Sequence, residues 1–302
     1  MALRLSTFAL LAALTLFHPQ ARAGYVALDV TCASCGTVNF SLASGVNNGG
    51  NIVGYFANGD GRYYGFYYQN GAYSEITISV NTFPEAINNN GVIAGYYNDG
   101  TYDHGFELTS AGTLSTISLG TNTRILGIND SGQYTALVDG VSEYWDGTAF
   151  HTLTVPGYST DFTAINNLGV IAGDLYFPSW VGLIRKADGT MIYPLHPPGT
   201  DNYGSLYGIN DNGLAVGVWN LAPGVSQYYG YYYDMNTGDY ALMPAYPGSD
   251  STYPMGINND GLVVGYFHTA SGDQAFEYTP EPSTLLLVAG AALALWRRRR
   301  EA

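Results

Sequence analysis

The sequence predicts an all-β fold, a six-bladed β-propeller over residues 24–278. Three observations lead to this prediction: a turn motif recurs six times at intervals of 37 to 48 residues, short β-prone runs follow each copy, and the chain contains 39 glycines and 27 tyrosines. Four short strands in about 40 residues is the period of a propeller blade. An open β-solenoid and a β-sandwich are the alternatives, and helices within these residues would argue against the propeller.

Each copy of the turn motif starts with a β-branched residue that is followed directly by asparagine, and a glycine lies four residues after the β-branched one. A second glycine lies eight residues after it in five copies, whereas Ala136 stands there in the third. Asparagine and glycine tolerate positive φ, so the turn predicts a tight hairpin, and the second glycine predicts close backbone packing in the next strand. The β-branched residues are Val46, Ile87, Ile128, Ile165, Ile209 and Ile257.

Two further strands are expected after each hairpin. Third strands are predicted at 63–68, 103–108, 228–233 and 273–278, and fourth strands at 73–80, 113–119, 150–155 and 239–246. The sixth copy ends at Tyr278, after its third strand, and residues 25–30 resemble the fourth strands elsewhere. We therefore expect the N-terminal strand to pair with the last blade and close the ring, which removes two open sheet edges.

Residues 1–23 have the pattern of a signal peptide. Arg4 supplies a positive charge, the run 8–17 is apolar, and Ala21 and Ala23 provide the small residues that a signal peptidase requires. Cleavage is expected after Ala23. The alternative is an N-terminal membrane anchor, for which the apolar run is short.

Residues 279–302 combine a short motif, Pro280, Glu281 and Pro282, with an apolar run over 285–296 and four final arginines, Arg297, Arg298, Arg299 and Arg300. This order resembles a PEP-CTERM sorting tail, the exosortase signal of Gram-negative bacteria. The resemblance implies secretion across the inner membrane, transient insertion of the apolar segment as a transmembrane helix, exosortase cleavage near Pro280 to Ser283, and a final place at the cell surface or in the extracellular matrix. A plain tail anchor is the alternative, although a twelve-residue helix is only about 18 Å long.

The repeats also resemble the HAF-type extracellular repeat family, in which an Ile-Asn-x-x-Gly-x-x-x-Gly unit precedes a His-Ala-Phe unit. The first unit matches well, and residues 103–106 and 273–276 come closest to the second. The resemblance covers nearly all of residues 24–278. It implies an exported repeat protein and adds little about biochemical activity.

Residues 24–278 contain 22 of the 24 acidic residues but only four lysines and arginines, which leaves a formal net charge of −18. Such a body repels phosphate backbones, so the sequence argues against a nucleic-acid partner. Cys32 and Cys35 are expected to form a local disulfide in an oxidising compartment, with free thiols and redox activity as alternatives.

The sequence contains no Gly-x-Ser-x-Gly, His-Glu-x-x-His or phosphate-binding glycine motif. We therefore predict no catalytic residue, no metal site and no cofactor, and a protein that is not an enzyme. The Asn-x-x-Gly turns offer side-chain oxygens, so weak calcium binding is the one cofactor alternative.

Loops that join the second strand to the third, and the fourth strand to the next blade, share one face of a propeller. Aromatic rings beside carboxylates suit sugars, so this face predicts binding of glycan, exopolysaccharide or another surface component. One alternative is a carbohydrate-active lyase or hydrolase, for which Glu85 and Asp161 are the acids nearest the inner strands, and another is a purely structural matrix protein. The predicted ligand-binding residues are Tyr158, Asp161, Trp180, Asp201, Tyr203, Asp250 and Tyr253.

Overall fold

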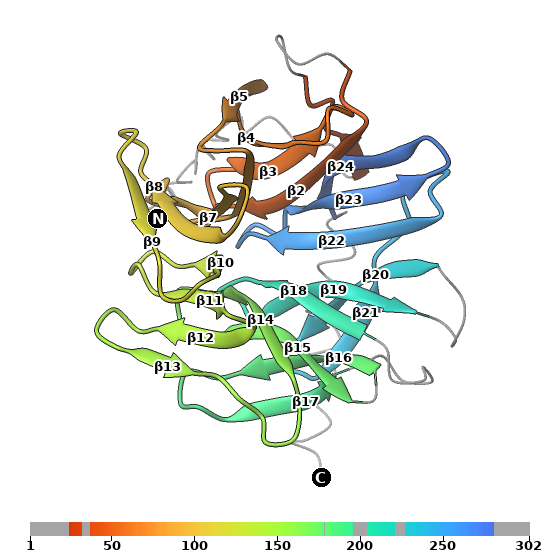
Figure 1. Ribbon diagram of the computed structural model, residues 1–302. Helices are drawn as coiled ribbons and strands as arrows, with labels where there is room; N and C mark the ends of the chain where they lie inside the picture. Colours follow the sequence, from red (N-terminus) through yellow and green to blue (C-terminus); the bar gives the residue numbers. More distant parts are fainter. Residues whose placement is uncertain (1–23, 32–36, 178, 196–203, 221–226, 281–302) are drawn as a thin grey trace, which may run out of the picture.

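In a computed structural model, the protein is described over residues 24–31, 37–177, 179–195, 204–220 and 227–280. All regular elements in these ranges are β-strands (Figure 1), and none of the described residues forms a helix long and apolar enough to cross a membrane. The predicted signal peptide, the cysteine pair and the tail from Glu281 onward lie outside the described residues.

The strands form four separate four-stranded sheets and one eight-stranded sheet, in a propeller-like arrangement. Within each repeat, neighbouring strands are antiparallel and consecutive in sequence. The first three sheets are β2 (Phe40–Val46), β3 (Ile52–Ala57), β4 (Tyr63–Gln69) and β5 (Ala72–Ile76); β6 (Asn81–Ile87), β7 (Ile93–Asn98), β8 (Asp103–Leu108) and β9 (Leu114–Ile117); and β10 (Thr123–Ile128), β11 (Tyr134–Val138), β12 (Val141–Trp145) and β13 (Phe150–Thr152).

The fourth and fifth repeats share the eight-stranded sheet. Its halves are β14 (Thr160–Ile165), β15 (Ile171–Phe177), β16 (Ser179–Arg185) and β17 (Met191–Leu195); and β18 (Gly204–Ile209), β19 (Leu214–Asn220), β20 (Tyr228–Asp234) and β21 (Asp239–Leu242). A single parallel bridge between Val181 and Gly204 joins the halves. The prediction of six separate four-stranded blades is therefore wrong, because β16 and β18 approach closely enough for one backbone pair and only four blades are separate sheets.

The last sheet contains β22 (Ser251–Ile257), β23 (Val263–Thr269), β24 (Gly272–Thr279) and the N-terminal strand β1 (Gly24–Ala27). Strand β1 pairs antiparallel with β24, from Gly24 opposite Thr279 to Ala27 opposite Phe276. This pairing confirms that the N-terminal strand supplies the outer strand of the last sheet. Figure 1 shows the first and last repeats side by side, with β2 next to β24, so that the sheets surround a common centre.

Hydrophobic clusters fill the spaces between neighbouring sheets. Val53 and Ile76 of the first sheet, for example, pack with Phe106 of the second. Ala43 and Phe66 of the first sheet pack with Val264 of the last, which closes the circle. The two halves of the eight-stranded sheet meet through an equivalent cluster, lined by Ile184, Leu206 and Tyr231 among others. Each repeat is therefore held by burial of its apolar faces against both of its neighbours.

The second glycine of the repeat allows a close backbone approach, as the sequence predicts. A Cβ atom added at Gly54 would lie 2.0 Å from the carbonyl oxygen of Leu42 on the neighbouring inner strand, and one added at Gly217 would lie 1.8 Å from that of Ser205. A real Cβ cannot approach so closely, so any larger residue would push the two innermost strands apart.

Candidate functional site

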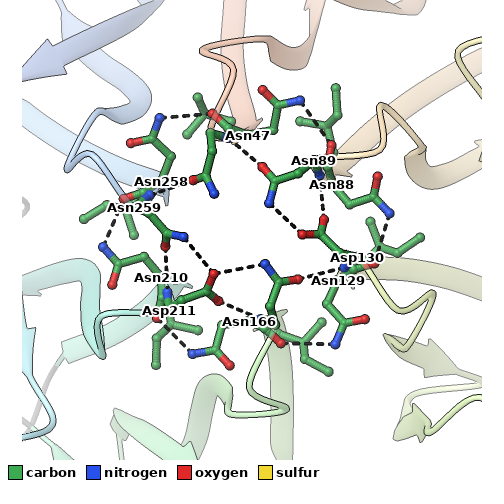
Figure 2. Close-up of a pocket in the computed structure, with 18 residues that line it drawn as sticks. Asn47, Asn88, Asn89, Asn129, Asp130, Asn166, Asn210, Asp211, Asn258 and Asn259 are labelled. Atoms are coloured by element: carbon green, nitrogen blue, oxygen red, sulfur yellow. Dashed lines mark hydrogen bonds between the residues drawn. The ribbon is translucent and has the colours of Figure 1, made fainter.

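Six asparagines form a closed ring at one end of the molecule (Figure 2). Each Nδ2 donates to the backbone carbonyl of the equivalent asparagine in the next repeat, over 2.9 to 3.1 Å. Each Oδ1 also accepts from the backbone N–H four residues later, which holds its own turn. This position therefore requires a side chain with both a donor and an acceptor, which the amide of asparagine provides. The ring consists of Asn47, Asn88, Asn129, Asn166, Asn210 and Asn258.

A second ring lies beside the first. Here the backbone N–H of each following residue donates to the side-chain Oδ1 of its equivalent in the next repeat, over 2.7 to 2.9 Å. An acceptor oxygen is sufficient at this position, so aspartate serves as well as asparagine. These residues are Asn48, Asn89, Asp130, Asn167, Asp211 and Asn259. The turn oxygens that suggested weak calcium binding thus have structural partners in both rings.

A channel leads inward from the rings, between the innermost strands. All six innermost strands carry a bulge at the residue two before the β-branched position. A β-bulge changes the direction of one side chain. Here the bulged residues line a channel cavity of about 80 Å³. Five of the six are uncharged, and Glu85 is the exception. The bulged residues are Ser44, Glu85, Leu126, Thr163, Tyr207 and Met255.

Glu85 lines the channel as a half-buried side chain to which none of the described residues donates a hydrogen bond, and its burial raises its pKa to about 8. Arg124 opposes this rise and the charge of Asp161 adds to it, so all three side chains share one electrostatic environment. Asp161 has a raised pKa for the same reason, burial, and its Oδ1 is buried without a partner. A carboxylate without a partner in low dielectric is costly, so this pair is poised to accept protons or a cation.

Asp174 lies opposite Asp161 on the neighbouring strand β15. It accepts a hydrogen bond from the backbone N–H of Leu206 at 2.8 Å, and burial raises its pKa well above the usual range. Arg124 is bound instead by Asp103, whose Oδ2 lies 2.6 Å from both Nε and a terminal nitrogen of the guanidinium. The acidic groups around the channel therefore outnumber its arginine.

Aromatic rings surround this acidic group on the side of the first, second and last repeats. Phe83 contacts Tyr55, Tyr63 and Tyr96, with ring centroids 4.7 to 5.2 Å apart. Arg124 lies 4.8 Å above the ring of Tyr96, which connects the aromatic rings to the charged ones. We call the set the aromatic belt; it consists of Phe40, Tyr55, Tyr63, Phe83 and Tyr96, with Tyr228, Tyr253 and Tyr266 of the fifth and last repeats.

The belt is only partly covered by protein. Tyr63 is 38 % exposed, and Tyr55, Phe83 and Tyr96 are intermediate between buried and exposed. Next to Arg124, a cleft of about 420 Å³ opens between the second and third repeats, lined by Asp103, Leu137 and Asp139 among others. The belt and the cleft together leave room for a ligand with apolar faces and polar edges. We call the channel, acidic group, belt and cleft the funnel.

Two of the seven predicted ligand-binding residues, Asp161 and Tyr253, occupy equivalent positions on innermost strands. Each lies four residues before the β-branched residue of its repeat, on β14 and β22, and Tyr253 stacks on Tyr266 at 4.5 Å. Trp180 lies on β16 and contacts Tyr176 at 5.6 Å. Tyr158 and Asp250 are exposed loop residues, and Asp201 and Tyr203 lie outside the described residues.

Sequence reasoning missed Arg124 and every residue of the aromatic belt except Tyr253. One signal was available, because Phe83 and Arg124 lie four residues before the β-branched residue of their repeats, as Asp161 and Tyr253 do, whereas the buried Leu42 and Ser205 hold this position in two other repeats. The tyrosines of the second strands had no distinguishing signal, since tyrosine is abundant throughout the chain. In the described part of the chain, no three His, Cys, Asp or Glu side chains are grouped to hold a metal ion.

Comparison with protein families gives one match, the PEP-CTERM protein-sorting motif, over residues 279–300. This motif marks a chain for processing by exosortase, so the tail indicates an exported protein with a surface or extracellular location. The match is confined to the tail. No curated protein matches the chain.

Several solved structures are similar to the body. A mutant Aleuria aurantia lectin, in complex with Fucα1-6GlcNAc, shares 12 % identity with a TM-score of 0.49 over 82 % of this chain and 95 % of the lectin. The β-propeller domain of the Trilobed protease from Pyrococcus furiosus shares 11 % identity with a TM-score of 0.46, over 81 % and 95 %. Porphyromonas gingivalis dipeptidyl peptidase 4 shares 8 % with a TM-score of 0.40 over 68 % of this chain, which spans only 34 % of that chain.

Proposed function

We propose that this protein is an exported, exosortase-processed propeller with six repeats that binds glycan, such as the exopolysaccharide of the extracellular matrix, through its funnel. The observation that carries the proposal is the partly exposed aromatic belt around carboxylates without partners. Sugar rings offer apolar C–H faces to aromatic rings and hydroxyls to carboxylates. The resemblance to HAF-type repeats, the transient membrane segment and processing by signal peptidase are parts of the same proposal.

A second candidate function is favoured by Glu85 and Asp161. Both carboxyls have raised pKa values and lie in one electrostatic environment, as the acid and base of a carbohydrate-active hydrolase or lyase would. A carboxyl with a pKa of about 8 is protonated at neutral pH and can donate that proton to a leaving oxygen. Binding without turnover remains our first proposal, because the partly exposed aromatic belt offers a surface for sugar rings.

The test measures retention of the full-length protein on immobilised exopolysaccharide and, in parallel, the release of reducing or unsaturated ends. The variants Phe83→Ala and Tyr96→Ala remove belt rings, while Phe150→Ala, an exposed ring on β13, serves as the matched control. Chelator and added calcium form a second arm that tests the turn oxygens as ion sites.

Saturable retention that the belt variants weaken and the control preserves would support glycan binding. Release of new ends that Glu85→Gln abolishes would establish the enzyme instead. Absence of retention by a folded protein, in calcium and in chelator alike, would overturn both functions and favour a structural matrix role.

A further inference from the structure

We infer that the funnel selects a glycan bearing free amino groups, so that one ammonium enters the channel beside Glu85, close enough to Asp161 to feel its charge, while its sugar ring rests on the aromatic belt. This inference rests on the glycan-binding function proposed above and names its ligand class. It follows from three features of the described residues: carboxylates without partners, an aromatic surface above them, and the size of the channel.

The first feature is charge. Glu85 has no hydrogen-bonding partner among the described residues, and Asp161 has a buried oxygen without one. The neighbouring arginine does not fill this need, because Asp103 binds the guanidinium of Arg124 through contacts of 2.6 Å. A neutral hydroxyl can donate to such an oxygen, but an ammonium offers three donors and compensates the charge as well.

The second feature is the position of the rings. Tyr55 and Tyr96 both contact Phe83, two residues before Glu85 on β6, and the pKa values of both hydroxyls are raised by burial and by the charge of Glu85. Both phenols thus remain neutral, and neutral aromatic faces attract cations. Arg124 already uses the Tyr96 ring in this way, at 4.8 Å, which shows that the belt accommodates a positive group.

The third feature is size. The channel cavity of about 80 Å³ has about a fifth of the volume of the 420 Å³ cleft. We therefore assign the small amino group to the channel and the sugar ring to the space above it, where the belt is open and the cleft lies at its side. The channel thus selects the amino substituent of the sugar, and the belt and cleft accept the rest of the oligosaccharide.

Binding of an amine should also displace protons. Arg124 and Asp161 are the charged groups that act on Glu85, and of the two only Arg124 favours its charged form; Tyr55 and Tyr96 also lie within reach of its charge, and Asp161 in turn acts on Asp174. Glu85 is therefore mainly protonated in the free protein below about pH 8, and an incoming ammonium should release its proton. Affinity should rise with pH until the amino groups of the ligand themselves lose their charge.

The experiment titrates the full-length protein with three matched oligosaccharides: β-1,4-linked glucosamine, its fully N-acetylated form and the corresponding glucose oligomer. Calorimetry in buffers of different ionisation enthalpy counts the protons released. The variants are Glu85→Gln and Asp161→Asn. Their controls, Glu75→Gln on the outer strand β5 and Asp188→Asn in an exposed turn, remove the same charges elsewhere. A short lysine peptide tests for attraction of any polycation.

We expect the glucosamine oligomer to bind at least about tenfold more tightly than the other two, with proton release, and both funnel variants to abolish this preference. Equal binding of all three oligosaccharides would overturn the amine inference and leave glycan binding intact. Binding of none by folded protein would overturn glycan binding itself. An equal effect of the control variants, or equal binding of the lysine peptide, would show that surface charge alone is responsible and would also overturn the inference.

Discussion

The Nδ2 of Asn258 donates to the backbone carbonyl of Asn47 at 3.0 Å, across 211 residues of sequence. This bond joins the last repeat to the first and makes the ring of asparagines continuous. Together with the pairing of β1 and β24, it closes the molecule twice, once near the axis and once at the outer edge of the last sheet. Because the molecule is closed, each innermost strand has another innermost strand on both sides.

Replacing Asn47 by aspartate should destabilise the protein by about 1–3 kcal/mol, because the carbonyl of Asn88 loses its donor and a carboxylate takes its place in a buried site. The free energy of unfolding in urea measures this effect. Asn48→Asp is the matched control, since its side chain acts as an acceptor for Asn259 and aspartate occupies the equivalent position in two repeats. Similar losses in both variants would contradict the roles assigned to the two rings.

The outer closure can be tested at Tyr25. Its ring contacts Tyr246, Phe276 and Tyr278, with centroids 4.4 to 5.4 Å apart, and its hydroxyl donates to the carbonyl of Pro244. Because the ring is partly buried, Tyr25→Ala should cost about 2 kcal/mol of stability, less than the loss of a fully buried ring. Limited proteolysis should then cut the last repeat first.

Val26→Ala provides the control for that prediction. Val26 lies on the same strand but is 47 % exposed, so its truncation should change stability by less than about 0.5 kcal/mol. If Val26→Ala and Tyr25→Ala had the same effect, the closure would depend on the strand's backbone pairing and not on the aromatic contact.

The hairpins could be predicted from sequence because their signal is local. Positive φ at Gly50 and at its five equivalents confirms the turn, and the asparagine before it was recognised by its spacing. The bonds between repeats could not be foreseen, since they depend on which carbonyl of the next repeat lies opposite. The merged sheet could not be foreseen for the same reason. Its one bridge, between Val181 and Gly204, depends on how closely two neighbouring repeats approach, which the local sequence does not determine.

The funnel was only partly predictable for a related reason. Glu85 and Asp161 are rare acids in apolar strands, so the sequence indicates them directly. Tyr55 and Tyr96, by contrast, are two of 27 tyrosines, and only the strand register decides which of these face the axis. The sequence thus predicts an aromatic binding face on loops, and two of the residues chosen for it, Asp161 and Tyr253, belong to the funnel.

Stability should fall as pH rises from about 4.5 to about 8. Burial raises the pKa of Glu85 from 4.5 to about 8, so the folded state holds a proton that the unfolded state releases within this interval. Below about pH 4.5 Glu85 is protonated in both states, and the folded state has its full stability relative to the unfolded one. As pH rises through 8, Glu85 ionises in the folded state as well, and this stability is lost. Asp161 and Asp174 have raised pKa values as well and act in the same direction.

Glu85→Gln should flatten this pH dependence and raise stability at pH 8 by several kcal/mol at most, since one pKa unit corresponds to about 1.4 kcal/mol. Arg124→Gln should steepen it, because Arg124 favours the ionised form of Glu85. Urea denaturation at a series of pH values tests both variants. An unchanged slope in Glu85→Gln would show that Glu85 ionises in the channel without cost.

The position of the chain ends predicts how processing affects the fold. Gly24 pairs with Thr279, and the sorting motif begins at that same residue, so both expected cleavage sites border one strand pair. Removal of residues 1–23 and of the tail after Pro280 would leave all ladder pairs of β1 and β24 intact. Mass spectrometry of the protein from its host should therefore find a form that starts at Gly24 and lacks Arg297 to Arg300, with the same unfolding free energy as the unprocessed chain. Recovery of the four arginines on the exported form would show that exosortase does not cut this tail, and a loss of stability after cleavage would show that the tail contributes to the last sheet.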